Sequence, residues 1–173
     1  MNSKAILIVS GEPNSIFLEI FFKVLKNKKI QNPLILITSE NLLKLQMKKL
    51  KYKKNIRLIK PTDITKYKLD NKSINLVNVK YNSMKAFEKI SRKSNLFIKN
   101  SFKIAFKILK QNKIKKFING PISKKSFLNK KFLGLTEYIS DSFSKKKNLY
   151  VDLQSNSFGL SFDNSLTNKI GDK

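Results

Sequence analysis

Cysteine and histidine are both absent from this chain of 173 residues, and glycine and proline are scarce at five and four residues. Without cysteine the protein has neither disulfides nor thiolate chemistry. Without histidine it lacks the commonest general base near neutral pH and the commonest transition-metal ligand. Functions that depend on a reactive thiol, an imidazole base or a Cys/His metal site are therefore excluded.

Long apolar runs are also missing, since none approaches the roughly 20 residues that a membrane-spanning helix needs. The run after Lys4 is short and is interrupted by Glu12 and Pro13, so we expect no signal peptide. An apolar fraction of 40% is adequate for a core, and the length fits one domain, or one domain and part of another. We expect a soluble cytoplasmic protein with no membrane partner.

Arginine is nearly absent from a very basic chain of net charge +26. Of the 37 basic residues only Arg57 and Arg92 are arginines, and the other 35 are lysines spread along the whole sequence. Recognition of phosphate and bases favours the planar fork of arginine. Two explanations stay open: codon drift in an AT-rich genome, or a selected polyanion-binding surface. Either predicts only non-specific binding of nucleic acid, at low salt.

Apolar runs alternate with helical patterns, which is typical of a parallel α/β fold. Strands are predicted at 4–10, 33–38, 56–59, 74–79 and 117–119, with helices at 15–27, from Ser39 to Met47, and within 87–110. Asn14 or Ser15 is the predicted cap of the first helix, and Thr38 or Ser39 that of the second. Continuous apolar character predicts that 4–10, 34–38 and 116–119 are central neighbours in the sheet.

The remaining segments have weaker patterns. Residues 61–73 are polar and predict a loop. A short helix is expected from Ser123, another around 137–143, and a strand at 149–153.

Two loops carry polar side chains that suit an anionic ligand. The stretch Asn119-Gly120-Pro121-Ile122-Ser123-Lys124 closes a strand and presents a hydroxyl and an ammonium group. Ten residues later, Gly134-Leu135-Thr136-Glu137 presents a second hydroxyl and a carboxylate. Open α/β sheets bind ligands at the carboxyl ends of their strands, so both loops can line one cleft.

A third loop, Gly11-Glu12-Pro13-Asn14-Ser15, can hold a phosphate at a helix N-terminus, although it is neither a dinucleotide fingerprint nor a Walker loop. We predict that it shares the cleft with Ser123, Lys124 and Thr136. Ordinary structural explanations stay open for each motif. The third loop can be a plain strand-to-helix turn, Lys124 one surface lysine among many, and Thr136 a helix cap.

These motifs also carry a family resemblance. Gly-Pro-Ile-Ser-Lys, followed by Gly-x-Thr-Glu, resembles the central region of the 4-hydroxythreonine-4-phosphate dehydrogenase family. The opening strand with Gly11-Glu12-Pro13, and Glu19 behind it, is similar to that family's first strand-loop-helix. Members are about twice as long, so the resemblance implies an N-terminal half, with a first domain over 1–120 and the start of a second over 121–173. It implies an incomplete parallel-sheet α/β/α architecture similar to isocitrate and isopropylmalate dehydrogenases.

The resemblance further implies an oxidoreductase of pyridoxal 5′-phosphate biosynthesis. In that family NAD oxidises a small phosphorylated hydroxy amino acid beside a divalent metal, which histidines from both subunits of a homodimer hold. Ser123, Lys124 and Thr136 are the implied substrate-binding residues. Leu135 replaces the family's histidine before that threonine, and residues 163–168 offer only Asp163 where the first metal-binding histidine would fall.

Catalytic and cofactor-binding residues are therefore not assigned, and we expect no NAD-dependent dehydrogenase activity from this chain alone. The alternative function is a non-catalytic basic α/β module that binds polyanions or nucleic acid. Steep salt dependence combined with a sequence or structure preference favours the alternative, and binding of a phosphorylated amino acid favours the first hypothesis.

Overall fold

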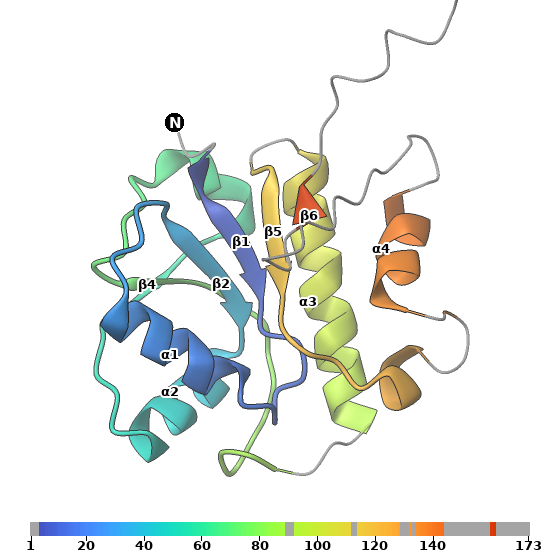
Figure 1. Ribbon diagram of the computed structural model, residues 1–173, viewed down its shortest axis with the longest axis horizontal. Coiled ribbons are helices and arrows are strands. Elements are labelled where there is room, and N and C mark those ends of the chain that lie inside the picture. Colours follow the sequence, from blue (N-terminus) through green and yellow to red (C-terminus); the bar gives the residue numbers. More distant parts are fainter. Residues whose placement is uncertain are drawn as a thin grey trace, which may run out of the picture.

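The computed structural model describes residues 4–88, 92–111, 114–128, 132, 134–143 and 160–161. Within these residues a six-stranded sheet has the order β3-β4-β2-β1-β5-β6 (Figure 1). The first five strands pair in parallel, and β6 pairs antiparallel with β5. The strands are β1 (Ile6–Val9), β2 (Leu34–Thr38), β3 (Ile56–Leu58), β4 (Ile74–Asn78), β5 (Lys116–Asn119) and β6 (Leu160–Ser161).

The central strands are β2, β1 and β5, as their apolar character predicted. Leu7 of β1 and Ile35 of β2 are fully buried, and Leu7 lies in register with Ile35 and with Phe117 of β5. Strands that are apolar at every position need cover on both faces, which a parallel sheet with crossover helices supplies. The predicted α/β fold with a parallel sheet is confirmed.

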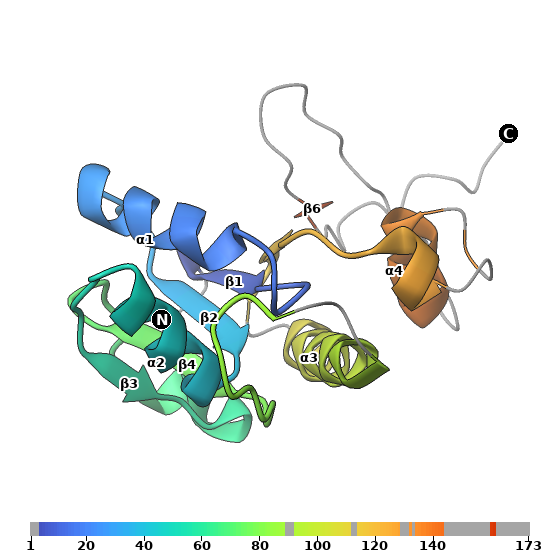
Figure 2. The ribbon, with the colours of Figure 1, turned by 90° about the horizontal axis from the view of Figure 1, so that it is seen from below.

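Helices cover the two faces of the sheet in separate layers. On one face α1 (Phe17–Asn27) contacts α2 (Glu40–Lys49). On the other face the 3₁₀ helix η2 (Pro61–Lys66) contacts α3 (Arg92–Lys110). Figure 2 shows α1 and α3 on opposite sides of the strands. The architecture is therefore the expected α/β/α sandwich.

An aromatic cluster attaches the last described elements to α3. Phe102 is fully buried and its ring lies 6.2 Å from that of Phe117 in β5. It also lies 6.1 Å from Phe127 in η3 (Lys124–Leu128) and 5.7 Å from Tyr138 in α4 (Leu135–Phe143). Burying such a ring contributes about 2–3 kcal/mol, so this cluster fixes η3 and α4 beside the end of β5.

The observed N-termini of α1 and α2 confirm one predicted helix cap and show the other to be wrong. Ser39 caps α2 as predicted, accepting a hydrogen bond from the Leu42 amide. The predicted caps of the first helix are wrong, because α1 begins after Ile16, without a side-chain cap. The Ser15 hydroxyl instead donates to the Glu12 carbonyl at 2.8 Å and shapes the turn that precedes the helix.

One other segment differs from expectation. The polar stretch predicted as a loop contains η2, which Pro61 begins with its fixed φ. The long helix α3 lies within the predicted stretch 87–110, and Phe87 itself has a φ of 62°, which is incompatible with a right-handed helix. The predicted strand at 149–153 lies outside the described residues.

Candidate functional site

The topological switch point of the sheet lies between β1 and β5. The chain leaves β1 toward α1 on one face, whereas it leaves β5 toward η3, which contacts α3 on the other face. Open α/β sheets bind their ligands outside the carboxyl ends of the strands at such a point. Two of the three loops singled out in the sequence are the loops at this point.

These two loops are in backbone contact. The Gly120 amide donates to the Val9 carbonyl at 2.7 Å, and the Glu12 amide donates to the Pro121 carbonyl at 2.7 Å. Gly11 has a φ of 72°, a conformation that favours glycine. A β-carbon on Gly11 would lie 2.3 Å from the Pro121 carbonyl oxygen. The strand-end loops therefore converge, and glycine permits their close approach.

Ser123 and Lys124 lie directly after this contact. The half-buried Ser123 hydroxyl accepts a hydrogen bond from the Ser126 amide at 3.3 Å, and the Ser123 carbonyl accepts one from Phe127 at 2.8 Å. Ser123 thus precedes and caps η3, and no described residue accepts a hydrogen bond from its hydroxyl. Lys124 is the first residue of η3.

A pair of side chains that sequence analysis missed holds η3 in place. The Asn95 amide donates to the Ser126 carbonyl at 2.9 Å, and the Ser126 hydroxyl donates to the Asn95 side-chain oxygen at 3.0 Å. Asn95 belongs to the first turn of α3, so these bonds join the loop after β5 to that helix. Nothing local in the sequence links two residues 31 positions apart.

Thr136 is the second residue of α4, where it is exposed, and so is Glu137. Because α4 contacts η3, Thr136 lies on the element next to the one that Lys124 begins. A ligand contact shared by Thr136, Ser123 and Lys124 stays a prediction.

A buried carboxyl at the switch point was not assigned a role from the sequence. Glu12 is 6% exposed, and among the described residues neither of its carboxylate oxygens receives a hydrogen bond of good geometry. Burial raises the pKa of Glu12, and the Ser94 side chain and the Asn14 amide lower it in part. Perturbed carboxyls gather at functional sites. The only sequence signal was the position of Glu12 between a strand and a helix.

The described residues do not fit the divalent metal that the family resemblance implies. No group of three or more His, Cys, Asp or Glu side chains comes together within them. No helix in the described part of the chain is both long and apolar enough to cross a membrane.

The fold and the paths of its loops define an open α/β protein whose topological switch point lies between β1 and β5. No protein-family model matches the chain, and no curated protein matches it by sequence. Among solved structures it is similar to a 4-hydroxythreonine-4-phosphate dehydrogenase from Burkholderia phymatum. The TM-score is 0.69 at 18% identity, over 80% of this chain and 43% of that one.

Two further structures agree. A 4-hydroxythreonine-4-phosphate dehydrogenase from Klebsiella pneumoniae has a TM-score of 0.68 at 16% identity, covering 80% of this chain and 44% of its own. A putative one from Salmonella typhimurium has a TM-score of 0.66 at 17% identity, with the same coverage. The resemblance noted from the motifs is thus confirmed as a likeness of fold. The chain spans less than half the length of these structures.

Proposed function

We propose that this chain binds a small phosphorylated hydroxy amino acid at the switch point between β1 and β5. The observation that carries the proposal is the backbone contact of the loop after β1 with the loop after β5. This contact supports the proposal because Ser123 and Lys124 follow it directly, in a fold similar to that of 4-hydroxythreonine-4-phosphate dehydrogenases. That is the position where open α/β sheets bind anionic ligands.

Each proposed side chain has a defined task. Lys124 pairs with the substrate phosphate as a compact point charge. The Ser123 hydroxyl donates a hydrogen bond to a phosphate oxygen, which is strengthened by the charge of its acceptor. Thr136, on the neighbouring helix, contacts the polar groups of the amino acid. The division into domains over 1–120 and 121–173 would place the phosphate contacts and Thr136 just beyond the boundary.

The redox part of the family's chemistry is not assigned to this chain. NAD would accept the hydride and a divalent metal would polarise the substrate alcohol in a complete dehydrogenase. The described residues supply no fitting metal-ligand group. We therefore propose substrate binding without NAD-dependent turnover. A cytoplasmic homodimer connected with pyridoxine biosynthesis belongs to the same proposal and is supported by the fold likeness.

Calorimetry with 4-phosphohydroxy-L-threonine tests the binding. We expect Lys124→Ala to weaken it about 10–100-fold, which corresponds to losing one charge-assisted hydrogen bond. Thr136→Val should weaken it less, because it removes a neutral contact. Lys26→Ala removes an exposed lysine from α1 and serves as the control. Equal affinities of the Lys124 and Lys26 variants would refute the phosphate site.

A separate assay tests the proposed absence of turnover. Purified protein is mixed with the same substrate, NAD and a divalent metal, and NADH is followed by absorbance. We expect no NADH. Turnover that a chelator abolishes would show that oxygen ligands replace the missing histidines.

A further inference from the structure

Asn119 and Gly120 form the only Asn-Gly pair in the chain, and this pair lies at the end of β5. Asparagine loses its side-chain amide fastest when glycine follows it, because glycine has no β-carbon to shield the backbone nitrogen that attacks the side chain. Substrate binding, as proposed, gives Asn119 no task. In an unfolded chain this asparagine is therefore the one most open to spontaneous loss of its amide.

In the folded protein, hydrogen bonds engage both of the groups that would react. The Gly120 amide, which would attack, donates to the Val9 carbonyl at 2.7 Å. The Asn119 side-chain amide, which would leave as ammonia, donates to the Gly120 carbonyl at 3.1 Å. Gly120 is buried and Asn119 is half-buried. The bond to Val9 crosses between β1 and β5, which lie side by side (Figure 1), so it exists only while the two strand ends are together.

The backbone around this pair has no room for an extra atom. A β-carbon on Gly120 would lie 2.1 Å from the Ser10 carbonyl oxygen, and one on Gly11 would lie 2.3 Å from the Pro121 carbonyl oxygen. The same Pro121 carbonyl accepts a hydrogen bond from the Glu12 amide at 2.7 Å. A single additional methylene in the main chain just before Gly120 would displace both loop residues from β1 and break these bonds.

We propose that Asn119 is a deamidation site that the contact between the two loops controls. When the strand ends separate, the Gly120 nitrogen loses its proton to hydroxide and attacks Cγ of Asn119. The Cγ–Nδ2 bond breaks, the leaving amide takes a proton from water and departs as ammonia, and a succinimide ring remains. Water then opens the ring at either carbonyl. The product at this position is aspartate, or isoaspartate, whose main chain is one methylene longer.

The modification makes the opening permanent. Either product replaces a neutral amide by a carboxylate at the switch point, and isoaspartate also moves the Gly120 amide away from the Val9 carbonyl. A molecule whose loops have separated is thus converted into one that stays open, whereas a molecule whose loops remain together keeps its asparagine. The reaction requires no ligand, so this proposal holds or fails independently of substrate binding.

Peptide mapping by mass spectrometry measures the deamidation rate of Asn119 at pH 8. The reference is a synthetic peptide with the sequence of residues 116–123, which contains the same Asn-Gly pair without the fold. We expect the native protein to react about 100-fold more slowly than the peptide, because reaction requires local opening of the strand ends. Protein unfolded in urea should react as fast as the peptide in the same urea. Equal rates in the native protein and the peptide would overturn the proposal.

Gly11→Ala tests whether the loop contact provides this protection. Its β-carbon would meet the Pro121 carbonyl oxygen, and the φ of 72° strains any residue that has a β-carbon. In the variant, shown to be folded by circular dichroism, we expect deamidation of Asn119 to be about tenfold faster than in wild type. Gly134→Ala, whose β-carbon meets nothing within 4 Å, should react at the wild-type rate. A folded Gly11→Ala variant that also reacts at the wild-type rate would show that the contact does not protect. The comparison of native protein with peptide depends on no variant.

Hydrogen exchange tests whether the opening becomes permanent. Wild-type protein is deamidated in urea and returned to buffer, and the isoaspartate form is isolated by cation exchange. Mass spectrometry should show faster amide exchange over residues 10–16 in this form than in wild type. Asn119→Asp has the same charge on a main chain of normal length, so we expect a smaller increase in it. Wild-type exchange in the isoaspartate form would show that the loops close again and would refute the permanent opening.

Discussion

The loops at the switch point can touch because Gly11 and Gly120 have no β-carbon. A β-carbon on Gly120 would lie 2.1 Å from the Ser10 carbonyl oxygen and 2.9 Å from the Phe17 ring. Neither the backbone nor a packed ring can move away without disturbing β1 or α1. The sequence showed a Gly-Pro turn at this position, but not that another loop would press against it.

We therefore expect Gly120→Ala to lower the free energy of unfolding by about 2–3 kcal/mol, the upper range for overpacking. Urea denaturation followed by circular dichroism measures the change. Gly134→Ala is the matched control, because a β-carbon there meets nothing within 4 Å. Similar stability of the two variants would mean that the loops separate easily.

Glu12 gives the protein a stability that depends on pH. Because its pKa is raised above 4.5 by burial, the folded state binds its proton more tightly than the unfolded state does. The contribution of Glu12 to stability is thus favourable at low pH. It is lost as the pH rises from the unfolded value of 4.5 through the folded pKa.

Glu12→Gln should remove this loss. We expect the variant to be more stable than wild type at pH 8 by about 1 kcal/mol, the low end for a buried polar group whose burial is only partly compensated, with a smaller difference at pH 4. Thermal unfolding across this pH range measures both. Glu19→Gln, which removes a partly exposed carboxylate of α1, is the control. A gain that grows toward low pH would contradict the assignment.

At the scale of elements, η3 depends on α3. Asn95 makes both side-chain bonds to Ser126, so Asn95→Ala would leave the Ser126 hydroxyl and carbonyl without these partners. We expect the free energy of unfolding to fall by about 1–2 kcal/mol. Amide exchange in residues 124–128 should become faster than in wild type, whereas exchange in β1 should change less. Exchange followed by mass spectrometry tests this. Unchanged exchange in η3 would show that the aromatic cluster alone holds it.

The elements also show how far the sequence could be interpreted. The run at Ile6–Val9 is apolar at every position, and Leu34–Thr38 is apolar except for its last residue. This pattern has few solutions other than buried parallel strands. The periodic helices and the Ser39 cap were predictable for the same local reason. The start of α1 and the left-handed conformation of Phe87 depend on contacts or backbone angles that no local pattern encodes.

The candidate site, too, was predictable from the sequence only in part. Motif spacing located Ser123 and Lys124 near a strand end, because glycine and proline mark turns in any context. The burial of Glu12 and the Asn95–Ser126 pair could not be predicted, since each depends on α3 packing against a loop distant in sequence. Such contacts form only when the folded sheet brings segments that are distant in sequence together.

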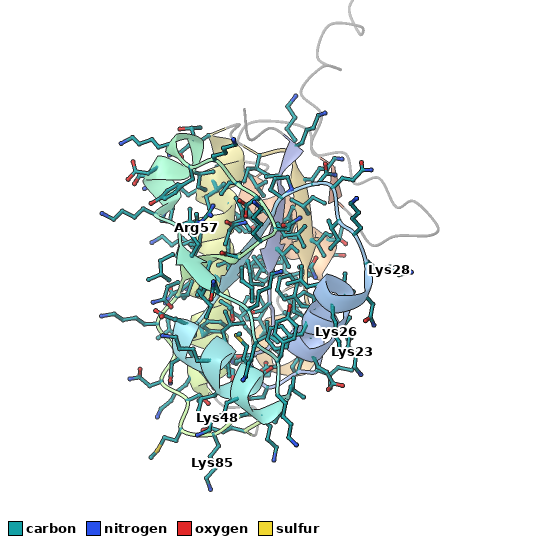
Figure 3. All side chains as sticks on the ribbon, turned by 90° about the vertical axis from the view of Figure 1, so that its left-hand side faces the viewer. Lys23, Lys26, Lys28, Lys48, Arg57 and Lys85 are labelled. Carbon is teal, nitrogen blue, oxygen red and sulfur yellow. The ribbon has the colours of Figure 1, made fainter. Side chains whose placement is uncertain are left out.

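At the scale of the whole molecule, the net charge opposes self-association through an exposed apolar surface. Basic side chains project outward from several elements, and the net charge is +26 (Figure 3). Ile16, directly before α1, and Ile20 and Val24 on α1 are 61%, 49% and 39% exposed. They follow one another every four residues, so they form a single stripe along the helix. Charge repulsion between molecules keeps such stripes apart at low salt.

High salt should therefore allow molecules to associate through the stripe. The Debye length falls from about 30 Å at 0.01 M to about 3 Å at 1 M, so repulsion fades while apolar attraction remains. We expect association through this stripe to be weak at low salt and to increase above roughly 0.5 M salt, measured by analytical ultracentrifugation. Ile20→Lys should prevent association, whereas Leu58→Lys, at an equally exposed position on β3, should not. If both substitutions act equally, added charge alone is responsible and α1 is not the contact surface.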